Sequence, residues 1–366
     1  MAQMTAHRGL ATRAIACWRT NGMPHSYSER VHNESLRAIS LIANWPVVNL
    51  GAWPTPIQIV QHSRLGQLLV KRDDLARFGR GGTSGVKARK LEGFLAHVSR
   101  NRYQQVMILL ANMTNLGHDI IPALTNLSVR TRLLIVNDPV LGQSQREHLF
   151  RNAEATVEFL GPSHAAGTIR LAAAALQAKM SGVRSIAVLP SPAHPSAVIG
   201  AARGLIEVVQ QCQASGQALP CLVFISSAAG TTAAGFILAS SVLRAAGVAN
   251  IRVMAVPVVP YRVENWLPLL LYSAQRTLGL RMRMPLPDYG VLRVPRNLSY
   301  GRFDNYLEAV CTRVQDTYDL VIDPIYGAKS WSAMEEYVSS ANLAHGNPVM
   351  FWHCGYSPDW EAFRNC

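Results

Sequence analysis

Short hydrophobic runs alternate with stretches of helical length along most of this chain, from about Leu68 onward. Strands that alternate with helices are typical of doubly wound sheets, with parallel strands and helices on both faces. The run 107–110, Met-Ile-Leu-Leu, is continuously hydrophobic, as expected of a strand covered on both faces. The pattern therefore predicts an α/β fold. The predicted strands are 68–71, 106–111, 132–136, 156–160, 185–189, 222–226, 251–258, 320–322 and 349–352, and the predicted helices include 87–97, 168–179, 196–211 and 233–245.

The length and composition fit a folded protein with a large core. At 366 residues the chain can form two domains, or one α/β body with an inserted lobe. Hydrophobic residues make up 49% of it and charged residues 16%. No apolar run reaches the roughly 18 residues that a membrane span needs. We therefore expect a soluble protein without a membrane partner.

The formal net charge is +13. Such a surplus attracts nucleic acids, acidic membranes or anionic small molecules. The basic residues are scattered, without the dense block or the interleaved aromatic residues that favour RNA or single strands. An anionic cofactor and substrate explain the charge more simply, and we expect no nucleic-acid partner.

The six cysteines show neither close pairing nor metal-type spacing. They are typical of reduced thiols in an intracellular protein, so we expect no metal site and a cytoplasmic location. The first 28 residues contain no acid. This composition faintly resembles an organelle transit peptide, and a short basic N-terminal extension is the simpler interpretation.

Ligands of doubly wound folds bind beyond the carboxyl ends of the strands, where loops lead into helices. The loop after the predicted strand 222–226 combines small residues, which let backbone N–H groups approach an anion, with hydroxyl donors and a helix start. It suits a phosphate group, although a tight turn that needs small residues for packing explains the same pattern. The phosphate-binding candidates are Ala228, Ala229, Gly230, Thr231 and Thr232.

A second Gly-rich loop, 81–85, opens the predicted helix that carries Lys87 in its first turn. Cations are disfavoured at a helix N-terminus, and this placement lowers the pKa of an amine, which suits a Schiff-base lysine. The neighbouring Arg89 and Lys90 have a plainer interpretation, as solvated cations or as partners of nearby acidic residues.

Two further loops that follow predicted strands carry polar side chains. Thr114 and Asn115 follow the predicted strand 106–111 and can hold a carboxylate or a phenolic oxygen, or simply cap a helix. Tyr326 follows the predicted strand 320–322, and Tyr300 is expected near it. A tyrosine there can act as an acid, although a buried tyrosine with one partner is the ordinary case.

Taken in this order, the four segments resemble the 1-aminocyclopropane-1-carboxylate deaminase and D-cysteine desulfhydrase family of pyridoxal-phosphate enzymes, of fold type II. The likeness covers about residues 50–356 and includes the stretch Lys87 to Glu92. It implies two open, twisted, parallel-type sheets with flanking helices, and a smaller domain inserted in a larger one. The implied division is an N-terminal extension 1–45, a large cofactor-binding domain 46–92 plus 201–366, and a small domain 93–200. It also implies pyridoxal 5′-phosphate as cofactor, a small amino acid as substrate, and a homodimer.

The resemblance also assigns roles to single residues. Lys87 would be the Schiff-base lysine and move the proton at the substrate's Cα, and Asn115 would hydrogen-bond the ring hydroxyl of the cofactor. The loop 228–232 would hold the phosphate. The remaining assignments are Thr114, Asn115 and Leu116 at the substrate, and Tyr300 and Tyr326 as the two active-site tyrosines.

Three positions depart from the family pattern. Val86 replaces an asparagine, Leu116 replaces a glutamine, and Gly327 replaces the glutamate that pairs with the pyridine nitrogen in the family. A carboxylate keeps that nitrogen protonated, so its loss makes the ring a weaker electron sink.

The departures favour expulsion of a leaving group from Cβ over ring opening. The leading hypothesis is therefore a lyase that acts through an external aldimine, by α,β-elimination or β-replacement. The alternatives are D-cysteine desulfhydrase or 1-aminocyclopropane-1-carboxylate deaminase proper, and a catalytically degenerate partner subunit of a biosynthetic pathway.

Overall fold

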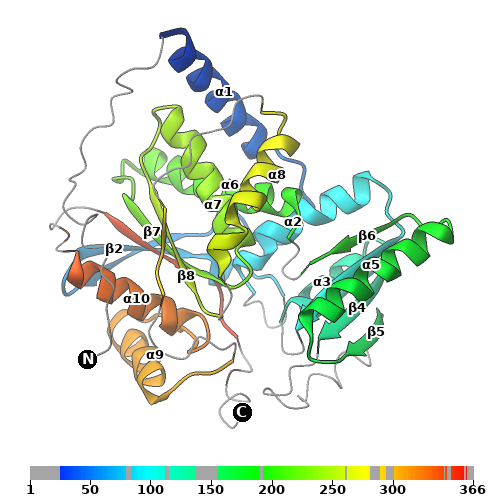
Figure 1. Ribbon diagram of the computed structural model, residues 1–366. Helices are drawn as coiled ribbons and strands as arrows, with labels where there is room; N and C mark the ends of the chain where they lie inside the picture. Colours follow the sequence, from blue (N-terminus) through cyan, green and yellow to red (C-terminus); the bar gives the residue numbers. More distant parts are fainter. Residues whose placement is uncertain are drawn as a thin grey trace.

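The structure of the chain is a computed structural model (Figure 1). It describes residues 25–79, 84–111, 115–136, 155–189, 193–259, 262–280, 289–293, 301–341, 343, 348–357 and 360, with the backbone alone at 25–28, 111, 115 and 118.

A larger sheet has the strand order β1-β2-β10-β7-β8-β9. An antiparallel hairpin, β1–β2, forms one edge, and the strands β2, β10, β7, β8 and β9 run parallel to one another. The carboxyl ends of these parallel strands therefore meet at one edge of the sheet. The bounds are Ile57–His62 for β1, Gly66–Arg72 for β2, Val349–His353 for β10, Leu222–Ser227 for β7, Arg252–Pro257 for β8 and Gly290–Val291 for β9.

Helices cover both faces of this sheet (Figure 1). The core on one face joins β7, β8 and β10 to α1, α6, α7 and α8, and the core on the other face joins the same strands to α9 and α10. The helix bounds are His25–Ala43 for α1, Pro195–Ser215 for α6, Thr231–Ala245 for α7, Leu267–Thr277 for α8, Asn305–Tyr318 for α9 and Gly327–Ser340 for α10.

A smaller, fully parallel sheet has the order β5-β4-β3-β6. Side chains of β3 alternate between its two faces. Ile108 and Leu110 pack in one core with helices α2 and α3, whereas Met107 and Leu109 pack against α5 on the other face. This alternation explains the continuous hydrophobic run. The bounds are Ala155–Leu160 for β5, Arg130–Val136 for β4, Gln105–Ala111 for β3, Ser185–Val188 for β6, Val86–Arg100 for α2, Asn115–Thr125 for α3 and His164–Met180 for α5.

Helix α2 connects the two halves of the molecule. Its first residue, Val86, belongs to the core of the larger sheet, and Leu91 and Phe94 belong to the core of the smaller one. The predicted domain boundaries stay a prediction.

One predicted strand is wrong. The segment 320–322 forms no sheet ladder among the described residues. Leu320 and Ile322 are buried under the sheet, while the carbonyl oxygen of Val321 pairs with His353 Nε2 at 2.8 Å. The carbonyl of Val321 is thus bonded to a side chain and not to a strand, and β10 is already paired on both sides with β2 and β7.

Candidate active site

The start of α2 is fixed to the carboxyl edge of the larger sheet. The N–H of Val86 donates to the carbonyl oxygen of Cys354, just beyond β10, at 3.0 Å. Gly85 has φ +31°, and a Cβ there would lie 2.5 Å from the carbonyl oxygen of Asp73, just beyond β2. Only glycine permits this approach. Lys87, in the first turn, is therefore held at the edge where ligands of such folds bind.

A buried cluster of ion pairs also holds the first turn of α2 in place. Arg89 donates through Nε and Nη2 to both carboxylate oxygens of Asp73, at 2.7 Å each, and also to Glu207 at 3.0 Å. The carboxylates of Asp73 and Glu207 raise the pKa of Arg89 despite its burial. Lys71 Nζ adds a 2.6 Å bond to Glu207. Arg89 is thus a buried structural cation that pairs with Asp73, not a solvated one.

Lys87 faces a buried carboxylate. Its Nζ lies 3.7 Å from Asp119 Oδ2, with the Lys87 side chain 21% exposed and that of Asp119 1%. Asp119 Oδ1 accepts a 2.9 Å hydrogen bond from Ser84, whereas Oδ2 has no hydrogen-bond partner among the described residues. The sequence pattern does not indicate Asp119, because its proximity to Lys87 depends on how α3 docks against α2.

Lys90 lies one turn further along α2 and is buried. Burial, together with the charge of Lys87, lowers the pKa of Lys90 to about 7, while Asp119 acts in the opposite direction. Within this segment, Arg89 pairs with the carboxylates of the buried ion cluster. Lys87 and Lys90 both interact with Asp119 instead.

The predicted phosphate loop lies between β7 and α7. Gly230 is the N-cap of α7, in the left-handed conformation with φ +82°, and no side chain within the described part of the chain caps this helix. Ser227 Oγ, next to the loop, is buried without a hydrogen-bond partner among the described residues. A helix start with an unsatisfied hydroxyl beside it is suited to an anion.

The loop meets the start of α10. Ser226 Oγ lies 2.8 Å from Ser330 Oγ and donates to the carbonyl oxygen of Tyr326 at 3.2 Å. Asp323 precedes α10, and its Oδ1 accepts from the N–H groups of Tyr326 at 2.6 Å and Gly327 at 3.3 Å. Burial raises the pKa of Asp323 despite these hydrogen bonds. The ring of Tyr326 packs against Ile325.

Gly327 has no room for the side chain that the family pattern carries. A Cβ there would lie 2.7 Å from Ile322 Cβ. The packing of Ile322 under the start of α10 therefore leaves no space for a glutamate at position 327.

Some predicted site residues lie outside the part of the chain that the structure describes. Thr114 and Tyr300 are outside the described residues, and Asn115 is described by its backbone alone, as the first residue of α3. Leu116 is buried in the core of the smaller sheet, which leaves its backbone as the only part suited to a substrate.

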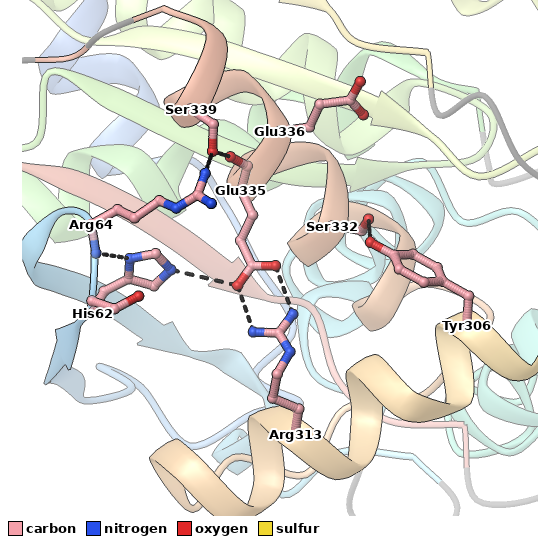
Figure 2. A pocket seen from close by; sticks show the side chains of 9 residues that line it. His62, Arg64, Tyr306, Arg313, Ser332, Glu335, Glu336 and Ser339 are labelled. Atoms are coloured by element: carbon pink, nitrogen blue, oxygen red, sulfur yellow. Dashed lines mark hydrogen bonds and ion pairs between the residues drawn. The ribbon is translucent and has the colours of Figure 1, made fainter.

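A cavity of about 420 Å³ lies along α10 beyond its first turn (Figure 2). Its central carboxylate, Glu335, accepts two hydrogen bonds from Arg313, at 2.8 and 2.7 Å, and one from Trp331 at 3.0 Å. The His62 imidazole, whose Nε2 lies 3.6 Å from Glu335 Oε1, and the hydrogen bonds from Arg313 lower the pKa of Glu335 to about 2, against the effect of burial. Because its central carboxylate is already paired with Arg313, we do not place the active site here. The cavity is lined by His62, Ser63, Arg64, Tyr306, Arg313, Ser332, Glu335, Glu336 and Ser339.

Within the described residues, no helix is long and apolar enough to cross a membrane, and no group of three His, Cys, Asp or Glu side chains is arranged for a metal ion.

The two sheets and their flanking helices form the fold of the fold type II pyridoxal-phosphate enzymes, which confirms the predicted fold class. The structure is similar to that of an ACC deaminase homologue, with a TM-score of 0.70, 21% identity, and coverage of 87% of this chain and 94% of the other. It is also similar to an L-serine ammonia-lyase from Rhizomucor miehei, with a TM-score of 0.56, 14% identity, and coverage of 87% and 98%.

Diaminopropionate ammonia lyase from Escherichia coli, solved with an aminoacrylate–PLP azomethine reaction intermediate, has a TM-score of 0.56, 14% identity, and coverage of 93% of this chain and 92% of its own. No protein-family model matches the sequence, and no curated protein is significantly similar to it. The likeness therefore rests on structure.

Proposed function

We propose that the chain is a pyridoxal-phosphate-dependent enzyme that acts on a small amino acid, with Lys87 as the residue that carries the cofactor. The observation that supports this most directly is the position of Lys87. It is fixed at the carboxyl edge of the larger sheet by Cys354 and Asp73 and is still partly exposed. Structures of similar fold include lyases, one of them with a PLP intermediate.

The residues at this edge fit the cofactor. The start of α7 and the unsatisfied Ser227 hydroxyl suit the phosphate, and the loop 228–232 would surround it. The start of α3, where Asn115 begins the helix, suits a second anionic group. We assign the substrate carboxylate to this helix start and the ring hydroxyl to Asn115.

When bound, the cofactor withdraws electrons from the substrate's Cα. Lys87 would hold and move the proton at that atom, because its amine is both fixed and partly exposed. Tyr326, whose carbonyl oxygen accepts from Ser226 at the end of β7, would complete the site from the α10 side. We assign Tyr300 as the second tyrosine of the site.

Packing at Gly327 bears on the reaction. Because a side chain there would collide with Ile322, a carboxylate from this position does not reach the ring nitrogen. A weaker electron sink favours reactions that expel a leaving group from Cβ. We therefore propose α,β-elimination or β-replacement on a small amino acid, rather than ring opening.

The cofactor assignment is tested by reconstitution. The chain is mixed with pyridoxal 5′-phosphate, its visible absorbance recorded, and the cofactor fixed with borohydride and located by peptide mass spectrometry. We expect the label on Lys87 and its loss in Lys87→Ala. The matched control is Lys179→Ala, at an exposed lysine on α5, which should retain both signals. A label at another lysine contradicts the assignment.

The reaction is tested with a panel of L- and D-amino acids, and the release of ammonia and of a 2-oxo acid is measured. To test for β-replacement, the same panel is incubated with added sulfide and the replacement product is measured. Turnover of 1-aminocyclopropane-1-carboxylate would favour the deaminase instead. Absence of turnover with every amino acid, in protein that holds the cofactor, would favour the degenerate partner subunit.

We also propose a homodimer in the cytoplasm. Its support is a row of exposed apolar side chains along α8, where Trp266 is 43% exposed, Leu269 67% and Tyr272 48%. Exposed apolar patches mark interaction surfaces. Light scattering of the wild type and of Leu269→Glu tests it, and a wild-type monomer at micromolar concentration contradicts it.

A further inference from the structure

Helix α5 is apolar on two opposite faces. Its inner face is buried against the smaller sheet through Leu171, Ala174 and Ala178. Its outer face carries large hydrophobic side chains in solvent, with Ile169 70% exposed, Leu176 59% and Met180 80%. A helix that is hydrophobic all round is normally buried, and an exposed apolar patch marks an interaction surface. The outer face of α5 therefore has the composition of a contact surface.

These side chains belong to one stripe along the helix. Apart from one adjacent pair of alanines, the residues of the stripe recur every three or four positions, which places them on one side of α5. Arg170, which pairs with Glu158 of β5, borders the stripe on one side and Lys179 on the other. The stripe consists of the exposed residues Ala165, Ile169, Ala172, Ala173, Leu176 and Met180.

The stripe is symmetric about its centre, the midpoint between Ala172 and Ala173. Ile169 and Leu176 are equally far from this midpoint along the chain, and the two terminal residues of the stripe are related in the same way. In two antiparallel copies of α5 that meet at the midpoint, Ile169 of each copy faces Leu176 of the other. The alanines at the centre let the two helices approach closely. A two-fold contact requires a surface that is complementary to itself, and this stripe provides one.

Charge favours the antiparallel arrangement over a parallel one. In antiparallel copies the two Lys179 side chains lie toward opposite ends of the contact. In parallel copies they would lie side by side, and like charges in contact are costly. Because α5 contains no acidic residue, no carboxylate of the helix would compensate for them. A second copy in the antiparallel orientation therefore fits both the apolar stripe and its charged border.

We propose that the outer face of α5 binds a second copy of this chain, as an antiparallel helix pair with its two-fold axis between Ala172 and Ala173. This contact is separate from the exposed row on α8, because α5 packs on the smaller sheet and α8 packs in the core of the larger one (Figure 1). Together the two contacts would join dimers into larger assemblies. One helix from each chain makes a small interface, so association through α5 should depend on protein concentration.

The test uses full-length protein that carries Leu269→Glu, in which the contact along α8 is removed. Sedimentation equilibrium over a range of concentrations measures the association that remains, and we expect a dimer that dissociates on dilution. If α8 makes no contact, the wild type is this same dimer and Leu269→Glu leaves it unchanged, so the test of α5 holds in either case. A monomer at every concentration up to about 100 μM, where a contact of micromolar affinity is saturated, overturns the proposal.

Ile169→Glu in this background should weaken the association at least about tenfold, because each carboxylate would be buried against Leu176 of the other copy. The further substitution Leu176→Lys in the same chain should restore most of the association, since each glutamate then faces a lysine of the other copy. Thr168→Glu places the same charge on α5 at an exposed position outside the stripe. It is the matched control and should leave the association unchanged.

Three results contradict the α5 contact. Association that Ile169→Glu does not weaken excludes the stripe as the interface, and equal weakening by Thr168→Glu shows that its position is unimportant. A double variant with Leu176→Lys that associates as weakly as Ile169→Glu alone excludes the antiparallel pairing. Circular dichroism establishes that each variant is folded, as expected for substitutions at exposed positions.

Discussion

Arg89 donates to both carboxylate oxygens of Asp73, at 2.7 Å each, from a side chain that is only 4% exposed. The arrangement bonds the first turn of α2 to the segment after β2. Removal of one member of such a pair leaves a buried charge without compensation.

Arg89→Met should therefore lower the free energy of unfolding by about 3–5 kcal/mol, measured by urea denaturation. Arg276→Met, at an exposed position of α8, is the control and should change it by no more than about 0.5 kcal/mol. Equal stability of the two variants would show that the ion cluster does not stabilise α2.

Gly327→Ala introduces a Cβ at 2.7 Å from Ile322 Cβ. Overpacking of this kind costs about 1–3 kcal/mol, and Gly327→Glu should cost more. Gly161→Ala, where no atom lies within 4 Å of the added Cβ, is the control. Thermal melting measures all three variants, and a Gly327→Ala variant that melts like the wild type would refute the collision.

Ser227→Ala should separate stability from cofactor binding. In the cofactor-free protein the Ser227 hydroxyl is buried without a partner among the described residues, so its removal should leave stability unchanged or raise it. The affinity for pyridoxal 5′-phosphate should fall about fivefold, since one hydrogen bond contributes about 1 kcal/mol. Titration by absorbance measures the affinity. Unchanged affinity would place the phosphate elsewhere.

His194 should make stability depend on pH. Its Nδ1 accepts from the N–H of Ser196 at the start of α6, and burial together with His97 lowers the pKa of His194 to about 4. In the unfolded chain a histidine titrates near 6.5, so between pH 6.5 and 4 the unfolded state binds more protons. Stability is therefore complete above pH 6.5 and falls as the pH drops, by up to about 3 kcal/mol at pH 4.

Urea denaturation between pH 4 and 7 measures this slope. His194→Asn keeps an oxygen for the Ser196 N–H and should flatten the slope. A wild type and a His194→Asn variant with the same pH dependence would assign the effect to other groups.

The sequence predicted the class of fold well because hydrophobic patterning is local. The run around Ile108 and Leu109 is hydrophobic throughout because α2 and α3 cover one face of β3 and α5 covers the other. The segment 320–322 has the same local character, but His353, 32 residues after Val321, binds the carbonyl oxygen of Val321. Strand β1 was missed because it lies at an edge, where only Val60 and His62 are buried.

At the site, the local sequence pattern indicates Lys87 and the phosphate loop, since both lie at helix starts next to glycines. The pattern does not indicate Asp119, because its distance from Lys87 depends on the docking of α3 against α2. The same limit applies to Arg89, which was interpreted only as a surface cation or a partner of nearby acids. Tertiary contacts decided between those interpretations in favour of Asp73.

Helix α2 is bonded at its first turn to the larger sheet and is buried along its length in the core of the smaller one. A displacement of the smaller sheet relative to the larger one would therefore act on the helix that carries Lys87. The position of this amine and the packing of the two halves of the molecule are thus coupled through α2.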